Sequence, residues 1–466
     1  MEKEHLNPVR IFAICLMWIF FLSTPTLFAQ VESAWPTGKV IDTVHLKDSS
    51  GDSYSLYLPE NYQPSVPTPV LFVFDPAARG SLGVDTFREA AGSRGWIVVC
   101  SNVSRNGPYE KNFEQAGSLF SDVLTRFSID PEMIFVAGFS GGARLATTLA
   151  VLSGQIRGVI ACGAAFSPNA GQMPLPGVSF AFTGIVGTKD MNYQEIWKAG
   201  DWLDRIQVPH RLFFYDGVHS WPPRAHLQRA IDWMIMEAQD VGNLDTSLVL
   251  NAYETDKNIA DTLYASGRFY ESRWEYRQLK QQYPSLTDAD DTSERLSQIE
   301  KSKDFKKEEK AFEEVRETED RLRKQYSERF RSELDKNPLS VNIKWWSQQM
   351  QVLEKKYGES EIVAENNMYA RIVNQLFAMP IEASEGFRRN EEVERSLYCN
   401  ELLTVLFPDN GRFKIRMAED LARLNRPDKM IDILEDLRAS GYSNTSYIRN
   451  NRFFKPYLDR PDFPFK

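Results

Sequence analysis

The feature that most constrains the fold of this chain is a glycine-flanked serine that joins an apolar run to a helix-like segment. Residues 134–137 lead into Gly138-Phe139-Ser140-Gly141-Gly142, and the apolar segment 145–150 follows. A G-x-S-x-G pattern in this setting is typical of a sharp strand-to-helix turn, where only small neighbours tolerate the close packing and the serine hydroxyl projects above the sheet edge. The pattern alone also fits a purely structural turn, so its interpretation depends on the rest of the chain.

Two further residues follow later strands in the order that a Ser-Asp-His triad on such a turn requires. The mostly apolar run 178–187 ends shortly before Asp190, the candidate acid, although a loop or helix-capping aspartate fits the same position. The run 211–215 is followed by a glycine-containing loop with His219, the candidate base. Asp216 is an alternative acid, but it lies in the same loop as His219 and would reach the imidazole awkwardly.

Backbone amides near the serine provide an oxyanion site in this interpretation. The N–H of Gly141 would lie at a helix N-terminus, where unpaired amides and the helix dipole favour negative charge. A second amide is expected after the apolar run 70–74, in the segment 75–78 with sequence DPAA. Because its proline has no N–H, Ala77 is the candidate donor and Ala78 the alternative. The same segment also fits a plain turn.

The first half of the chain alternates between strand-like and helix-like segments. Apolar runs begin near residues 70, 96, 134, 158, 179 and 211 and alternate with helical patterns. Before them, segments 40–46 and 54–58 flank a polar turn and predict an antiparallel hairpin at the sheet edge. We therefore expect an α/β fold whose mostly parallel sheet has helices on both faces, with the site at the carboxyl ends of the strands.

On these residues, segment 38–240 resembles the α/β-hydrolase fold, specifically the polyhydroxybutyrate-depolymerase and feruloyl-esterase type of serine esterase. The residues that carry the resemblance are the serine turn, the acid loop 187–190, and the segment 217–222 with sequence GVHSWP, which is similar to the glycine-histidine-tryptophan-proline loop of that group. Many relatives carry His-Gly after the strand at 70–74, whereas this chain has Asp75 followed by proline. The resemblance implies a serine esterase but does not specify its substrate.

Loops beside the expected site supply candidate substrate contacts. Asn102 and Arg105 follow a strand end and offer side-chain donors, although this loop fits a plain turn equally well. Trp221 is a candidate apolar wall beside His219, with packing of the loop as its alternative role. Only about fifteen residues separate the strands near 158 and 179, too few for a helical cap, so an open cleft and an ester attached to a polymer are expected.

The net charge argues against a nucleic-acid partner, and the N-terminal segment predicts where the protein is delivered. The formal net charge of −9 argues against an extended nucleic-acid surface, and nothing in the sequence indicates a metal or organic cofactor. Basic residues precede the apolar run 11–22, and a small-residue region ends at Ala29. Residues 1–29 are thus predicted to be a signal peptide of a secreted or periplasmic protein, with an uncleaved membrane anchor as the alternative. Three widely spaced cysteines are expected to be buried free thiols: Cys100, Cys162 and Cys399.

After a predicted catalytic domain at 30–242, residues 243–466 change to charged helical periodicity and predict an all-α helical-hairpin domain. Segments 258–284 and 418–437 each resemble a tetratricopeptide-like helix pair, although Ser272 stands where that repeat usually has alanine. Residues 301–336 predict one long amphipathic helix. This domain could shield the cleft, bind a protein partner or mediate self-association.

Three hypotheses about function remain at this stage. The first is a serine esterase in which Ser140, His219 and Asp190 form the triad. The second is a serine exopeptidase, because amide hydrolysis uses the same triad on this fold. The third is a non-catalytic interaction protein in which the hydrolase fold supports the helical domain; a misaligned triad would favour it.

Overall fold

The computed structural model describes residues 35–465 except 48–50, 168, 240–243 and 288–290, and it divides the chain into two compact units, Met1–Glu309 and Lys310–Lys466. The predicted signal peptide at 1–29 lies outside the described residues, and so does the domain boundary expected between residues 242 and 243. The helices from Thr246 to Lys301 belong to the N-terminal unit, so this unit extends well beyond the expected boundary.

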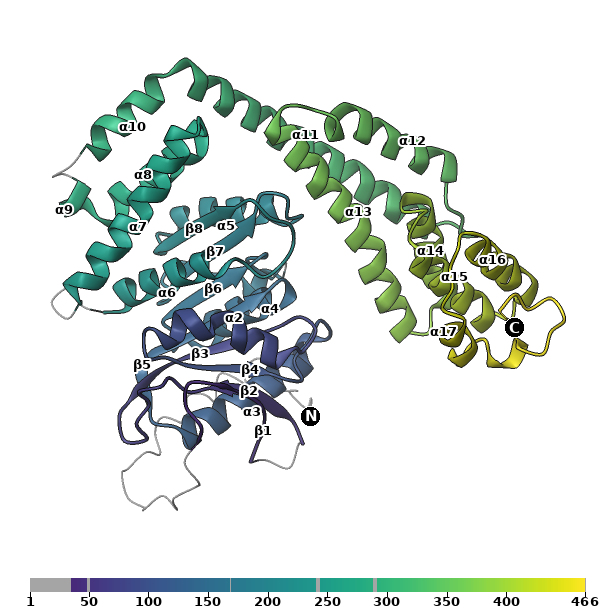
Figure 1. The fold of residues 1–466 in the computed structure, drawn as a ribbon, viewed down its shortest axis with the longest axis horizontal. Coiled ribbons are helices and arrows are strands. Elements are labelled where there is room, and N and C mark those ends of the chain that lie inside the picture. Colours follow the sequence, from purple (N-terminus) through teal and green to yellow (C-terminus); the bar gives the residue numbers. More distant parts are fainter. Residues whose placement is uncertain (1–34, 48–50, 168, 240–243, 288–290, 466) are drawn as a thin grey trace, which may run out of the picture. The chain divides into compact units, whose positions relative to one another are not determined.

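An eight-stranded sheet forms the centre of the N-terminal unit (Figure 1). Its strand order is β1-β2-β4-β3-β5-β6-β7-β8, and the pairs β1/β2 and β2/β4 are antiparallel while every other pair is parallel. This topology confirms the predicted mostly parallel sheet and its edge hairpin. The strands are β1 (Val40–His45), β2 (Ser53–Tyr57), β3 (Thr68–Phe74), β4 (Ile97–Ser101), β5 (Ile129–Phe139), β6 (Gly158–Cys162), β7 (Ala181–Gly187) and β8 (His210–Tyr215).

Helices cover both faces of this sheet because its strands are apolar on both sides. On β3, Leu71 and Val73 share a core with α2 and α6, whereas Phe72 faces the other side and stacks on Phe120 of α3 at a centroid distance of 3.8 Å. On β8, Phe214 likewise stacks on Trp197 of α5. The helices of these layers are α2 (Gly80–Gly92), α3 (Tyr109–Arg126), α4 (Gly141–Ser153), α5 (Tyr193–Arg205) and α6 (Arg224–Ala238), with a short 3₁₀ turn, η2 (Ala170–Gln172).

A helical hairpin covers the outer edge of β8, the last strand of the sheet. It consists of α7 (Thr246–Ala265) and α8 (Phe269–Gln282). An exposed edge strand presents unpaired backbone groups that invite aggregation. Here the indole N–H of Trp274 on α8 donates to the carbonyl of Leu212 on β8 at 3.2 Å, and its ring packs against Trp197 with centroids 4.5 Å apart.

Buried charges fasten this hairpin to the sheet. Asp256 of α7 accepts hydrogen bonds from Arg211 of β8 at 2.5 Å, from Arg229 of α6 at 2.6 Å and from the hydroxyl of Tyr283 at 3.0 Å. Arg229 also donates to Glu275 of α8 at 2.6 Å. All five side chains are buried. This Asp256 cluster explains why α7 and α8 are part of the N-terminal unit.

The predicted helix pair at 258–284 is confirmed as the hairpin α7–α8. Ser272, which departs from the repeat pattern, is fully buried and its hydroxyl donates to the carbonyl of Ala260 at 2.9 Å, so the interface between the two helices remains satisfied. Kinship to the tetratricopeptide repeat stays a prediction. Two further helices complete this region, α9 (Pro284–Thr287) and α10 (Thr292–Lys301).

The C-terminal unit is all-helical, as predicted. The long helix α11 (Lys303–Leu334) begins before the unit boundary at Lys310, and the part within this unit buries an apolar stripe that includes Val315, Leu322 and Tyr326. Trp346 lies in the same core, where its indole N–H donates to Glu333. The other helices are α12 (Ile343–Leu353), the π-helical turn η4 (Glu354–Gly358), α13 (Val363–Arg389), α14 (Val393–Leu406), α15 (Gly411–Arg423), α16 (Pro427–Ala439), α17 (Thr445–Asn450) and the 3₁₀ turn η5 (Lys455–Tyr457).

Two other predictions can be checked against the described residues. Cys100, Cys162 and Cys399 are buried free thiols, as expected, and β4 and β6, which carry the first two, are not neighbours in the sheet. Among the described helices, none combines the length and the apolar character that crossing a bilayer requires.

Candidate active site

Ser140 occupies the turn between β5 and α4 with a strained backbone. Its φ of 53° and ψ of −120° are rare for a residue with a side chain. The turn is tight enough to exclude larger neighbours: a Cβ at Gly142 would lie 2.0 Å from the carbonyl oxygen of Phe74, and one at Gly138 would lie 2.2 Å from that of Gly142. The glycines of the motif are therefore required by close packing, and they hold the serine at the carboxyl end of the sheet.

The structure brings Ser140, His219 and Asp190 into one hydrogen-bonded chain. The Nε2 of His219 lies 3.0 Å from the Oγ of Ser140, and its Nδ1 lies 2.9 and 2.8 Å from the two carboxylate oxygens of Asp190. Asp190 is fully buried, whereas the imidazole keeps 20% of its surface exposed. This arrangement leaves Nε2 as the acceptor for the serine proton and fixes the opposite nitrogen as the donor to the carboxylate.

Asp216, the alternative acid, lies elsewhere. Its side chain is 67% exposed and forms a surface ion pair with Lys189 at 2.9 Å. A carboxylate in that position is solvated and bound to a cation, whereas Asp190 is enclosed and faces the imidazole. The geometry therefore favours Asp190 over Asp216.

Three residues that sequence reasoning missed support the triad. The backbone N–H of Asn192 donates to Asp190 Oδ1 at 2.8 Å, and its side-chain amide donates to the carbonyl of Gly163 at 2.7 Å. The ring of Phe139 packs against the imidazole of His219 with centroids 4.6 Å apart. Because Asn192 lies two positions after the acid and Phe139 directly precedes the serine, both are local companions of the motifs. Gly163 directly follows β6 and is placed only by the fold.

The backbone N–H groups of the two expected oxyanion donors, Gly141 and Ala77, differ in whether they already have an acceptor. The N–H of Gly141 begins α4 beside the nucleophile, and no described acceptor is hydrogen-bonded to it. The N–H of Ala77, in contrast, donates to the carboxylate of Asp75 at 2.9 Å, and that of Ala78 donates to the Asp75 carbonyl at 3.1 Å. The structure thus differs from the expectation for Ala77, and for Ala78 as its alternative, because Asp75 itself takes up both amides.

Asp75 organises the loop after β3. Its buried carboxylate accepts hydrogen bonds from the guanidinium of Arg79 at 2.9 and 2.8 Å and from the indole N–H of Trp221 at 3.1 Å, in addition to Ala77. Burial raises the pKa of this carboxyl, but the hydrogen bonds from Arg79, Ala77 and Trp221 outweigh burial and hold the pKa below its usual value. Asp75 therefore stays ionised and connects this loop to the loop that carries His219.

The three candidate substrate contacts, Asn102, Arg105 and Trp221, have different surroundings in the structure. Asn102 donates to the carbonyl of Asp42 at 3.1 Å and accepts from Ser55 at 3.0 Å, so its side chain ties β4 to the edge hairpin and does not serve the site as expected. Arg105 is exposed, and its backbone forms an isolated bridge with Ala77. Trp221 is half-buried and packs edge-on against Phe87 and at a tilt against Phe139, so it packs its loop, and its contact with a substrate stays a prediction.

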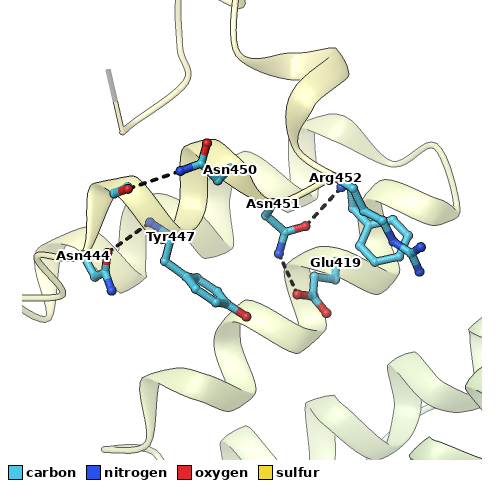
Figure 2. A pocket seen from close by; sticks show the side chains of 8 residues that line it. Glu419, Asn444, Tyr447, Asn450, Asn451 and Arg452 are labelled. Atoms are coloured by element: carbon cyan, nitrogen blue, oxygen red, sulfur yellow. Dashed lines mark hydrogen bonds between the residues drawn. The ribbon is translucent and has the colours of Figure 1, made fainter.

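A shallow hollow of about 660 Å³ lies in the C-terminal unit (Figure 2). The asparagines that line it already form hydrogen bonds within the protein. Asn444 accepts from the backbone N–H of Tyr447 at 3.0 Å, and Asn451 donates to Glu419 of α15 at 2.7 Å. Asn450 likewise donates to a neighbouring serine at 3.2 Å. Because these polar groups already have partners, the hollow indicates no particular ligand.

Comparison with known proteins gives distant similarities. No family model matches the sequence, and no curated protein matches it. Among solved structures, the S-formylglutathione hydrolase FrmB of Staphylococcus aureus is 16% identical, with a TM-score of 0.36, over 44% of this chain and 100% of its own. A ferulic acid esterase is 17% identical, with a TM-score of 0.35, over 43% of this chain and 98% of its own. Dipeptidyl peptidase 4 of Porphyromonas gingivalis is 17% identical, with a TM-score of 0.32, over 42% of this chain and 35% of its own.

Proposed function

We propose that this chain is a serine hydrolase that cleaves carboxylic esters through an acyl-enzyme. The observation that carries the proposal is the continuous hydrogen-bonded chain from Asp190 through His219 to Ser140, with the serine in a strained turn at the carboxyl end of a parallel sheet. Aligned triad members with a buried acid are the arrangement that nucleophilic catalysis by serine needs. This alignment also argues against a purely structural role for the serine turn.

In the acylation step, Ser140 Oγ attacks the ester carbonyl while His219 Nε2 takes the hydroxyl proton. The carbonyl π electrons move to oxygen, and the N–H of Gly141 at the start of α4 stabilises the resulting charge. Collapse of the tetrahedral intermediate breaks the bond to the alcohol oxygen, which receives the proton from the imidazolium. Asp190 holds the imidazole in the required tautomer and stabilises its charged form.

Deacylation repeats the sequence with water. His219 takes a proton from a water molecule, the hydroxide oxygen attacks the acyl carbon, and Ser140 leaves with the proton returned to its oxygen. Arg105 and Trp221 are the residues that we propose to border the substrate, since one is exposed beside the loop after β3 and the other packs next to His219 through Phe139. The short connection between β6 and β7 suits a bulky, polymer-linked ester.

Hydrolysis of a substrate panel tests this function. The protein from Gln30 onward would be assayed with aryl acetates, feruloyl esters and aminoacyl or dipeptidyl amides. We expect ester cleavage that falls by about 10⁴-fold or more in Ser140→Ala and in His219→Ala. The matched control is Ser179→Ala, an exposed serine of the same unit. Ester hydrolysis that survives Ser140→Ala would refute the proposal, and exclusive cleavage of amides would indicate an exopeptidase.

We further propose that residues 1–29 direct export and are removed after Ala29, as a basic segment, an apolar run and a small-residue cleavage region would require. N-terminal sequencing of the protein recovered from the periplasm or the medium should begin at Gln30. An intact N-terminus in a membrane fraction would instead indicate an anchor.

The helical region after residue 243 is proposed as a surface for a protein partner or for self-association. Light scattering of the purified chain tests self-association.

A further inference from the structure

The loop after β3 leaves the oxyanion site one donor short. Pro76 has no N–H, and the next three amides are all engaged by Asp75: Ala77 at 2.9 Å, Ala78 at 3.1 Å and Arg79 at 3.3 Å. Oxyanion sites for acyl transfer combine two or more donors that point to one small volume. With Gly141 as one donor, the described chain must supply the other from a different loop.

Asn106 lies at that place. Its side-chain Oδ1 is 1.9 Å and its Nδ2 3.4 Å from the point that a Cβ on Gly141 would occupy. By bond lengths this places Oδ1 within about 4.4 Å and the donor nitrogen Nδ2 within about 6 Å of the Gly141 nitrogen. The oxygen is the nearer atom, and a half-turn of the amide about its last torsion exchanges it with the donor nitrogen. Asn106 is exposed, and no hydrogen bond within the described chain occupies its side-chain amide. The amide is therefore available to an incoming group next to the first oxyanion donor.

The backbone holds Asn106 in this position from two sides. Its N–H donates to the carbonyl of Pro76 at 2.9 Å, directly beside the bridge between Arg105 and Ala77. On the other side, buried Asn112 of α3 accepts from the N–H of Arg105 at 3.2 Å and donates to its carbonyl at 2.9 Å. The backbone that carries the donor is thus fixed, and only the side-chain torsions of Asn106 remain to be ordered when charge develops.

We infer that the side-chain amide of Asn106 is the second oxyanion donor, together with the backbone N–H of Gly141. The inference rests on the proposed ester hydrolysis and replaces the expectation for Ala77. It also gives a reason for glycine at position 141, because any side chain there would displace the Asn106 amide. Asn106 is then a catalytic residue that touches the oxyanion of both tetrahedral intermediates.

Two substitutions of Asn106 separate hydrogen-bond donation from packing. Asn106→Ala removes the amide, and Asn106→Asp keeps its size but has no donor when ionised. We expect both to lower kcat for p-nitrophenyl acetate by about 10²-fold with little change in KM, since the donor acts mainly in the transition state. Active sites would be counted by fluorophosphonate titration and folding checked by circular dichroism. Glu110→Gln, an exposed residue at the start of α3, is the control that keeps its rate.

A double-mutant cycle with Gly141→Ala gives an independent test. In the wild-type background the new methyl group would collide with Asn106 and should lower kcat about as much as Asn106→Ala does. In the Asn106→Ala background there is no amide to displace, so Gly141→Ala should add little.

The outcomes distinguish the two levels of the proposal. If wild-type hydrolysis depends on Ser140 while Asn106→Ala and Asn106→Asp keep kcat within about twofold, Asn106 is not an oxyanion donor and the proposed function stands. If the losses from Gly141→Ala and Asn106→Ala simply multiply, the two groups do not act together and the inference is wrong. If the wild-type protein has no Ser140-dependent hydrolysis, both the function and this inference fail.

Discussion

The Asp256 cluster predicts that a carboxylate remote from Ser140 in the sequence decides the stability of the N-terminal unit. The carboxylate of Asp256 lies between the guanidinium groups of Arg211 and Arg229, and the exposed fractions of these three side chains are 2%, 1% and 5%. Asp256→Asn removes the negative charge but leaves both cations enclosed. Glu275 continues to neutralise Arg229, whereas Arg211 loses its counter-charge and keeps only neutral partners, the hydroxyl of Tyr283 and the amide oxygen of the new asparagine.

Breaking a buried ion pair from one side typically costs about 3–5 kcal/mol, because the remaining charge is desolvated without compensation. We expect Asp256→Asn to lower the free energy of unfolding by about this amount, since one of its two cations loses its counter-charge. The double variant Arg211→Met with Asp256→Leu should recover much of the loss, because it removes the stranded charge and leaves the pair of Arg229 and Glu275 intact.

Urea denaturation followed by tryptophan fluorescence measures this effect mainly in the N-terminal unit, since only Trp345 and Trp346 lie beyond Lys310. The control is Glu271→Gln on α8, whose partner Arg268 is 48% exposed, and it should cost less than about 1 kcal/mol. Equal losses for Asp256→Asn and Glu271→Gln would refute the reasoning. A large loss for Asp256→Asn that the double variant does not relieve would show that packing, and not the stranded cation, is responsible.

Three further predictions follow from the structure. Burial raises the pKa of Asp256, but the charges of Arg211 and Arg229 outweigh burial and hold this pKa below its usual value. The carboxylate therefore stabilises the fold above the pKa of an unfolded aspartate, about 3.9, and this stabilisation is lost as the pH falls through the lower folded pKa. Urea titrations below about pH 4 should show this loss in the wild type and not in Asp256→Asn. Asp75→Asn should lower kcat/KM by about 10²-fold, because an amide cannot accept all the hydrogen bonds that fix the loop after β3; unchanged esterase kinetics would contradict this. Gly163→Ala should lower kcat by a similar factor, since its Cβ would lie 2.8 Å from the ring of Phe139 and 3.1 Å from Asp190, whereas Gly154→Ala, which has the same positive φ and open space around it, should leave kcat unchanged.

The sheet and the order of the triad candidates could be predicted because both depend on local chain chemistry. Apolar runs of strand length alternate with helical periodicity, and the polar residues that matter follow directly after strand ends. Parallel strands bring those ends to one edge of the sheet regardless of the details of packing. Ser140, Asp190 and His219 therefore meet as their positions predict.

The loop after β3 shows where sequence reasoning failed. Position along the chain suggested that Ala77 points its N–H toward the site, but the carboxylate of Asp75 turns back onto this N–H. Whether an aspartate side chain folds onto its own loop depends on its other partners, here Arg79 and Trp221, and the second of these comes from a distant part of the sequence. The side chain of Asn102 departs from its expected position for the same reason, since its partners lie on the edge hairpin.

The extent of the N-terminal unit could not be predicted from the sequence either. The charged helical periodicity does mark the start of the helical part of the chain, but it does not mark a unit boundary. The helices α7 and α8 pack on the sheet through the Asp256 cluster and Trp274. Arg211 is read in the sequence as a polar residue at the start of a strand, and Asp256 as a charge on an amphipathic helix. Only the fold shows that both are buried and paired.

Active-site labelling with a fluorophosphonate tests the central claim most directly, because this reagent reacts with an activated serine and needs no knowledge of the substrate. The protein from Gln30 onward would be labelled beside Ser140→Ala and His219→Ala, with the modified peptide mapped by mass spectrometry. A covalent adduct on Ser140 that disappears in Ser140→Ala and forms far more slowly in His219→Ala is the predicted result. A folded wild-type protein that takes no label, or that is labelled at another residue, would contradict a catalytic triad at this site.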